Sequence, residues 1–145
     1  MIKELVPATQ RAAQLLRVRV EPLGVREPDD FGSALAAMTR TRPDALTTLN
    51  RQKVVDFAAA QRIPAMYEVA ATVRGGGLMS YGGDVDKSFA LVARYVDRIL
   101  KGAKPAELPV EQPNRYLLTI NLKTAKTLGL TIPPALLARV DEVVE

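Results

Sequence analysis

The sequence predicts an α/β protein with an open, mainly parallel sheet flanked by helices. Short apolar segments that suit strands alternate along the chain with longer segments of helical spacing. Glycine or proline stands at many of the boundaries between these segments. The length of 145 residues is that of one ordinary domain, and the apolar fraction of 48% is typical of a globular protein.

The expected elements follow one another in a regular order. Asp84 is a good N-cap for the longest helix, and Gly102 is placed to end that helix. Phe89 and Val96 belong to its apolar stripe, together with Val92 and Ile99. Further helices are expected at 3–16, 28–38, 51–61, 121–129 and from 133 onward. Strands are expected at 18–23, 45–49, 63–67, 78–81 and 116–120.

Composition argues against several kinds of chemistry. The chain has no cysteine and no histidine, which removes disulfides, the usual zinc ligand sets and nucleophile–histidine dyads. The glycine run at 75–77 precedes a strand instead of opening a helix, so it is read as a loop and not as a phosphate site. The acids at 84 and 86 are explained as a helix cap and a first-turn acid. We therefore expect no enzyme activity, no cofactor and no metal.

The net charge of +4 raises the question of a nucleic-acid partner. Basic residues are spread along the chain and acidic residues lie among them. Phosphate binding requires clustered positive charge, so a solvated surface is the preferred interpretation and no nucleic-acid partner is expected.

The ends of three predicted strands carry the candidate ligand-binding residues. Ligands of open parallel sheets bind outside the carboxyl ends of the strands. Groups that could bind a small solute stand at these ends: Asn50, Tyr67, Glu68, Ser80, Tyr81 and Gly82. Simpler interpretations remain open. The tyrosines at 67 and 81 could be packing residues, the acid at 68 a solvated loop residue, and the asparagine at 50 a helix cap.

Several motifs occur in a fixed order over most of the chain. They are GGLMSYG at 76–82, YVDRILKGAKP at 95–105, LPVEQP at 108–113, INLKTAK at 120–126, LGLTIPP at 128–134 and DEVVE at 141–145. This string resembles the C-terminal half of bacterial ABC transporter substrate-binding proteins, in the family that includes tryptophan- and tyrosine-binding lipoproteins.

The resemblance implies a type I periplasmic binding protein, in which two α/β lobes close on a solute by a hinge movement. It implies binding of a small organic solute such as an amino acid, delivery to an ABC permease, and a periplasmic location. The segments 67–68 and 80–82 would face the cleft between the lobes. Residues 1–82 and 106–145 would belong to the second lobe, and the helix 84–102 resembles an element of the first.

The resemblance also predicts what a complete relative carries before this region. No apolar signal segment follows Met1 and no first lobe is present, so we expect a truncated chain that stays in the cytoplasm if Met1 is the true start. A second interpretation is a stand-alone cytoplasmic α/β interaction domain, a homo-oligomer formed through the uncovered apolar face of the helix 84–102. A Rossmann-like enzyme is the weakest interpretation, because no phosphate-binding motif or placed catalyst supports it.

Overall fold

The computed structural model describes residues 2–25, 30–48, 52–112 and 114–145. The chain divides into two compact units, residues 1–42 and residues 43–145. Each unit is described by itself below.

The first unit contains two helices, α1 (Ile2–Leu16) and α2 (Asp30–Thr41). Pro7 lies inside α1, and the helix continues past it at the cost of one helical hydrogen bond. After α1 the chain turns at Arg17, whose φ of 55° is left-handed, and the amide of Val18 donates to the carbonyl of Ala13. In α2, Met38 is buried, as its place in the predicted apolar stripe requires.

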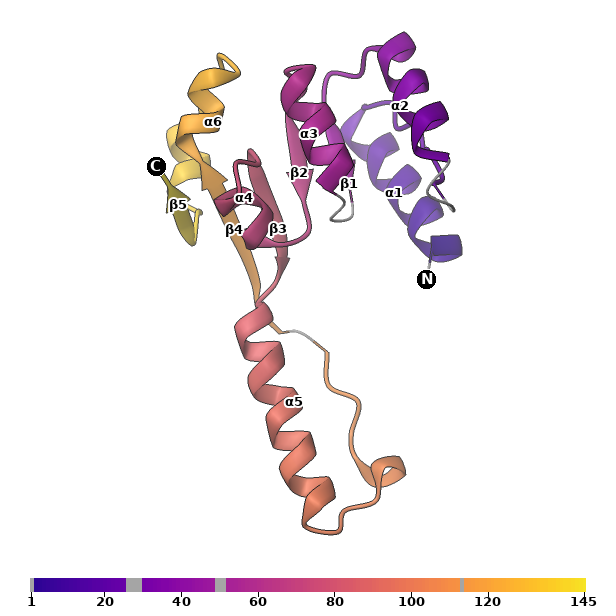
Figure 1. Ribbon diagram of the computed structural model, residues 1–145, viewed down its shortest axis with the longest axis vertical. Helices are drawn as coiled ribbons and strands as arrows, with labels where there is room; N and C mark the ends of the chain where they lie inside the picture. The colour runs from indigo at the N-terminus through magenta and orange to yellow at the C-terminus, as the bar shows by residue number, and fades with distance from the viewer. Residues whose placement is uncertain (1, 26–29, 49–51, 113) are drawn as a thin grey trace. The chain divides into compact units, whose positions relative to one another are not determined.

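The second unit is built on a five-stranded sheet in the order β1-β2-β3-β4-β5 (Figure 1). The first three strands run parallel, β4 runs antiparallel to β3, and β5 runs parallel to β4. Three of the four strand pairings are therefore parallel, which confirms the prediction of an α/β fold with a mainly parallel sheet. The strands are β1 (Leu46–Thr48), β2 (Ala65–Tyr67), β3 (Met79–Gly83), β4 (Tyr116–Asn121) and β5 (Glu142–Val144).

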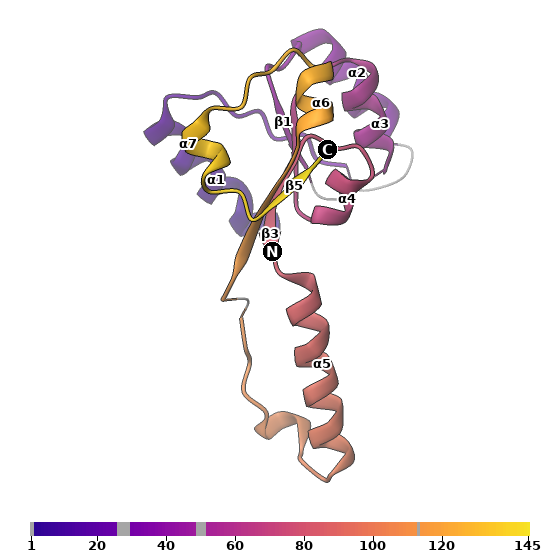
Figure 2. The same cartoon turned by 90° about the vertical axis from the view of Figure 1, so that its left-hand side faces the viewer.

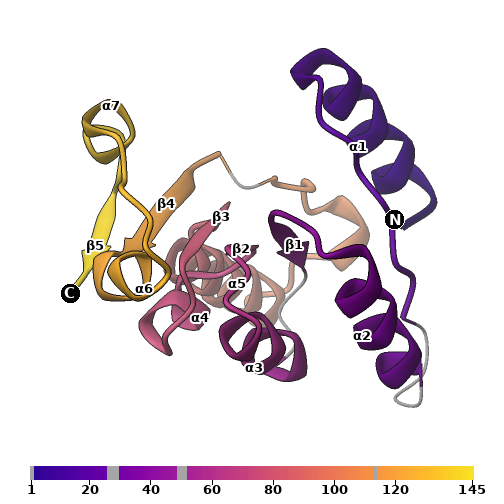
Figure 3. The ribbon, with the colours of Figure 1, turned by 90° about the horizontal axis from the view of Figure 1, so that it is seen from above.

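Short helices connect the strands of this unit and lie on both faces of the sheet. Figure 3 shows α3, α4 and α6 on one side of the sheet and α7 on the other. The bounds are α3 (Gln52–Ala60), α4 (Ala70–Arg74), α5 (Val85–Leu100), the 3-10 turn η1 (Pro105–Glu107), α6 (Leu122–Thr127) and α7 (Pro134–Leu137).

The core under α3 forms where the apolar face of this helix packs against the apolar face of β2. Val55 and Ala58 lie one turn apart on α3, while Ala65 and Tyr67 lie two residues apart on β2. These four residues are buried together. Helical and strand spacing each put the apolar side chains of one element on a single face, so the two faces cover one another.

The longest helix, α5, leaves the sheet at the end of β3, and the chain returns beside it before entering β4 (Figure 2). The side chain of Asp84 accepts a hydrogen bond from the amide of Lys87, and Gly102 takes the left-handed φ of 99°. Both predicted ends of this helix are therefore confirmed. The apolar stripe, by contrast, is open: Phe89 is 70% exposed, and Val92 and Val96 are exposed as well.

Two sequence expectations were wrong: the strand at 18–23 and the continuation of the last helix beyond α7. The segment 18–23 forms no strand: Val18 is exposed, and no β pairing reaches this segment in the described part of the chain. The described elements of its own unit are helices, so the unit offers this alternating pattern no strand with which to pair. The segment before the glycine run forms the helix α4, for which the sequence analysis made no prediction. The C-terminal residues 142–144 form β5, because β4 offers them a free parallel edge.

Candidate functional site

The carboxyl ends of β2 and β3 lie side by side. The two strands are parallel, and Tyr67 is the register partner of Ser80. Just beyond, the backbone of Glu68 packs against Gly82. The segments 67–68 and 80–82, chosen from the sequence as candidate ligand-binding residues, are thus next to one another at one edge of the sheet. Asn50, the remaining candidate, falls outside the described residues.

The side chains of Tyr67 and Ser80 point into the packed layer. Both are almost fully buried, and Tyr67 belongs to the core cluster with Val55 and Ala58. Burial, and more weakly the carboxylate of Asp56, raises the pKa of the Tyr67 phenol above its ordinary value of 10.0. The phenol of Tyr67 therefore stays neutral near pH 7. Its ring packs in the core, and only its backbone lies at the end of the strand.

Glu68 and Tyr81 have exposed side chains at the same edge. Tyr81 is 56% exposed and stacks on Tyr116 of the antiparallel strand β4, with ring centroids 5.7 Å apart and ring planes at 25°. Such an offset, nearly parallel stack is a favoured aromatic geometry. Tyr116 was not a sequence candidate. It opens a predicted strand, and only the antiparallel pairing of β3 with β4 brings it to Tyr81.

Two glycines permit close approaches, Gly82 at this edge and Gly77 before the amino end of β3, against the ring of Tyr67. A Cβ on Gly82 would lie 1.8 Å from the carbonyl oxygen of Glu68. A Cβ on Gly77 would lie 2.7 Å from the ring of Tyr67. Both approaches are shorter than any side chain tolerates, so glycine is required at 82 and strongly favoured at 77.

A row of polar residues crosses the sheet behind this edge. Thr48, Tyr67, Ser80, Thr119 and Glu142 are successive register partners on the five strands. The hydroxyl of Thr119 is fully buried and has no hydrogen-bond partner among the described residues. At the end of the row, the carboxylate of Glu142 accepts two hydrogen bonds of 2.8 Å from the guanidinium of Arg74.

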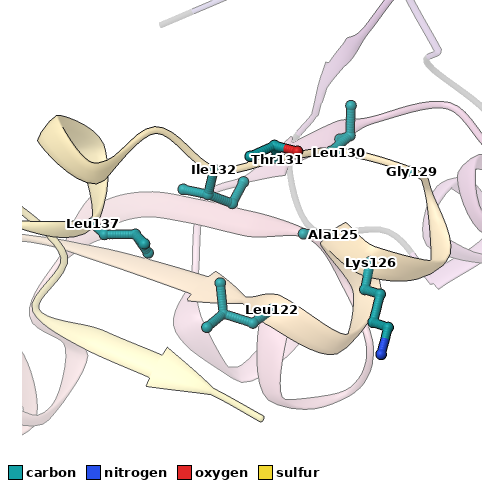
Figure 4. A pocket seen from close by; sticks show the side chains of 8 residues that line it. All are labelled: Leu122, Ala125, Lys126, Gly129, Leu130, Thr131, Ile132 and Leu137. Carbon is teal, nitrogen blue, oxygen red and sulfur yellow. The ribbon is translucent and has the colours of Figure 1, made fainter.

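A pocket of about 380 Å³ lies elsewhere in the unit (Figure 4). Because β4 runs antiparallel to β3, Leu122 follows β4 at the opposite edge from the carboxyl end of β3. The pocket contains none of the candidate residues. Its walls are Leu122, Ala125, Lys126, Gly129, Leu130, Thr131, Ile132 and Leu137.

Two negative findings concern the described ranges alone. No group of three metal-binding side chains comes together there. None of the helices there has the length and apolar character that crossing a membrane requires.

The architecture is that of one lobe of a periplasmic binding protein, a mostly parallel sheet flanked by helices. The chain matches about half the length of such a protein. Residues 2–144 match the family model described as ABC transporter substrate binding protein. The chain belongs to this family. No protein among the curated sequences matches it.

Solved structures of similar proteins share the fold of this chain. An ABC domain in complex with L-Trp from Streptococcus pneumoniae is 28% identical with a TM-score of 0.85, and the match covers 98% of this chain and 51% of that one. A conserved domain protein from Vibrio cholerae is 26% identical with a TM-score of 0.83, covering 98% and 50%. The ligand-free, open substrate binding protein CD0873 from Clostridium difficile, at 19% identity, a TM-score of 0.61 and coverage of 98% and 50%, shares the fold. This chain spans about half the length of all three.

Proposed function

We propose that this chain supplies part of the solute-binding component of an ABC-type importer, and that it binds a small organic solute such as an amino acid. The observation that carries the proposal is the meeting of the segments 67–68 and 80–82 at the carboxyl ends of two parallel strands. Open α/β sheets bind ligands at such edges. The family supports a binding role, and the relative solved with L-Trp supports an amino acid as the solute.

Within this proposal, residues 1–82 and 106–145 belong to one lobe and the helix 84–102 to the other. Two features support the division. The helix α5 leaves the sheet at the single point where β3 ends and β4 begins, and the amide of Asp84 donates to the carbonyl of Arg115 there. Its exposed stripe around Phe89 has the apolar character of a surface that packs in a core. The partner surface would be the half that the relatives have and this chain does not match.

The remaining parts of the proposal follow from the family. The protein would act outside the cytoplasm, hand its solute to an ABC permease and carry out no chemical reaction. Closure of two lobes around the solute would create the surface that the permease recognises.

A titration followed by NMR tests the proposal on the chain itself. Uniformly labelled protein is titrated with each of the common amino acids at millimolar concentration, since half of a cleft is expected to bind weakly. We expect one or more amino acids to shift the amide signals of 67–68 and 80–82. The pocket around Lys126 serves as an internal control and should not respond. The proposal is wrong if no amino acid moves the signals at the strand ends.

A second candidate function is self-association through α5. The observation that favours it is the open stripe formed by Phe89, Val92 and Val96. Sedimentation of the wild type and of the double variant Phe89→Lys, Val96→Lys tests it, with Lys87→Glu on another face as the matched control. A wild type that stays monomeric at high concentration removes this candidate.

A further inference from the structure

The return segment, residues 103–111, leads from the end of α5 back toward the sheet. The amide of Ala103 donates to the carbonyl of Arg98 at 3.0 Å, and in the turn η1 the amide of Leu108 donates to the carbonyl of Pro105 at 3.2 Å. Beyond this turn, residues 109–112 form no backbone hydrogen bond with another part of the described chain. Side-chain contacts therefore hold this part of the segment beside α5.

Two neighbouring residues of α5 make these contacts. One guanidinium nitrogen of Arg94 donates to both carboxylate oxygens of Glu111 at 2.9 Å. The hydroxyl of Tyr95 donates to the carbonyl of Pro109 and lies 3.2 Å from a carboxylate oxygen of Glu111. Val110, between the two held residues, is 96% exposed, so its side chain adds no apolar packing. The contacts that join the segment to α5 here are polar.

These contacts leave the apolar stripe of α5 open. A helix turns by about 100° per residue, so Arg94 stands nearly opposite Val92 and Val96. The return segment is thus attached away from the stripe, in agreement with the exposure of Phe89 and Val96. The stripe stays available to a partner surface while the segment is bound.

The chain is held again a few residues later, at the sheet. The amide of Asp84 donates to the carbonyl of Arg115 at 3.2 Å, where β3 ends and β4 begins. Glu111 is therefore attached to α5 and Arg115 to the strand ends. The crossing from the helix back to the sheet lies between these two residues.

We propose that Arg94, Tyr95 and Glu111 form a clasp that makes the return segment and α5 one body, with Arg94 and Tyr95 as positioning residues for the crossing back to the sheet. The inference rests on the proposed two-lobe function and moves its division: residues 106–111 go with α5, and the second lobe resumes only beyond Glu111. The motifs at 95–105 and 108–113 meet in this clasp, which gives both a physical role.

Cleavage by the glutamate-specific endoproteinase Glu-C tests the clasp on the chain itself. The bond between Glu107 and Leu108 lies in the return segment, and slow cleavage there follows the population of the released segment. Loss of one exposed polar contact raises that population about two- to fivefold. We expect Tyr95→Phe and Arg94→Gln each to accelerate cleavage at this bond by that factor. Arg94→Lys, which keeps the charge, should have a smaller effect.

Lys101→Gln is the matched control. It removes the same charge from the same helix and breaks an ion pair of the same 2.9 Å length, but its partner Asp97 belongs to α5. Cleavage should proceed at the wild-type rate in this variant. Equal acceleration in Lys101→Gln and Arg94→Gln would show that fraying of α5 exposes the bond, and it would overturn the inference. Unchanged rates in both Arg94→Gln and Tyr95→Phe would overturn it too.

Backbone residual dipolar couplings of the wild type test the new division. We expect the couplings of 106–111 to fit the alignment of α5 and not that of β3 and β4. A fit to the sheet instead would put the division back at 106. One common alignment for the helix, the segment and the sheet would mean that they are not separate bodies. Either of these two results contradicts the inference.

The outcomes separate this inference from the proposed solute binding. Neither measurement uses a solute, so failure of the clasp leaves the amino-acid titration at 67–68 and 80–82 as it stands. A confirmed clasp in a chain that responds to no amino acid would support the division and overturn the amino acid as the solute.

Discussion

The carbonyl oxygen of Glu68 occupies the place where a side chain on Gly82 would begin. The distance from that oxygen to an ideal Cβ is 1.8 Å. The backbones at the ends of β2 and β3 are therefore in direct contact. This contact holds the segments 67–68 and 80–82 of the candidate site next to one another. The first prediction concerns this contact, and three more concern other polar groups of the same unit.

Replacing Gly82 by alanine should separate the two strand ends. We expect Gly82→Ala to lower the free energy of unfolding by about 1–3 kcal/mol, the usual cost of forcing extra atoms into a packed place. Urea unfolding followed by circular dichroism measures it. Gly75→Ala is the matched control, because a Cβ at that position meets atoms no closer than 3.5 Å. An unchanged midpoint in Gly82→Ala would show that the close approach is absent in solution.

The buried hydroxyl of Thr119 should be dispensable for stability. A buried polar group without a partner costs about 1–3 kcal/mol, and Thr119 has none among the described residues. We therefore expect Thr119→Val, which keeps the shape of the side chain, to leave stability unchanged or raise it by about 1 kcal/mol.

Thr124→Val is the contrasting variant, because the Thr124 hydroxyl donates to the carbonyl of Gly76 at 3.0 Å. It should destabilise by about 1 kcal/mol. Clear destabilisation by Thr119→Val would instead reveal a partner for this hydroxyl, such as an ordered water molecule.

The side chain of Asn121 should contribute more to the free energy of unfolding than an ordinary helix cap does. Its side-chain oxygen accepts from the amide of Thr124 at 2.9 Å, and its amide nitrogen donates to the carbonyl of Val73 at 3.2 Å. Asn121→Ala loses a cap and a buried hydrogen bond, so we expect a loss of about 2 kcal/mol.

Asp84→Ala is the comparison for Asn121→Ala, because Asp84 caps α5 and makes no buried contact of that kind. Its removal should cost about 1 kcal/mol or less. Equal effects of the two substitutions in thermal unfolding would rule out a contribution from the bond to Val73.

The pair Arg74–Glu142 predicts a pH dependence at the acid end. The hydrogen bonds from Arg74, and its charge, hold the pKa of Glu142 below its ordinary value of 4.5. A carboxylate whose pKa is lower in the folded state stabilises the fold above the unfolded-state pKa, and that contribution is lost as the pH falls through the folded-state pKa. Both side chains are partly exposed, so the contribution is about 1 kcal/mol or less.

Unfolding of wild type and Glu142→Gln between pH 7 and pH 3 tests this prediction. The wild type should be the more stable protein at pH 7, and the two curves should converge only as the pH falls through the lowered folded-state pKa of Glu142. A difference that stays constant over the whole range would mean that the carboxylate charge has no role.

Much of the candidate site could be predicted from the sequence as a set of neighbouring segments. The rule that ligands bind at the carboxyl ends of parallel strands selected 67–68 and 80–82, and the structure brings these segments together. The sequence did not predict which face of the sheet each of these side chains occupies. Tyr67 and Tyr81 looked equivalent as residues at strand ends, yet one is buried and the other exposed. Alternation along a strand assigns faces, but only the helices α3 and α4 determine which face is covered.

The sequence by itself determined the local elements of this protein: the apolar spacing of α3, the cap of α5 at Asp84 and the strand–helix alternation of the α/β fold. These depend on interactions between residues a few positions apart, which a periodic pattern records. The tertiary structure alone decided that β4 runs against β3, that Tyr116 stacks on Tyr81 and that the C-terminal residues close the sheet as β5. Those outcomes depend on pairing between strands more than twenty residues apart, where the partner and not the local pattern sets the result.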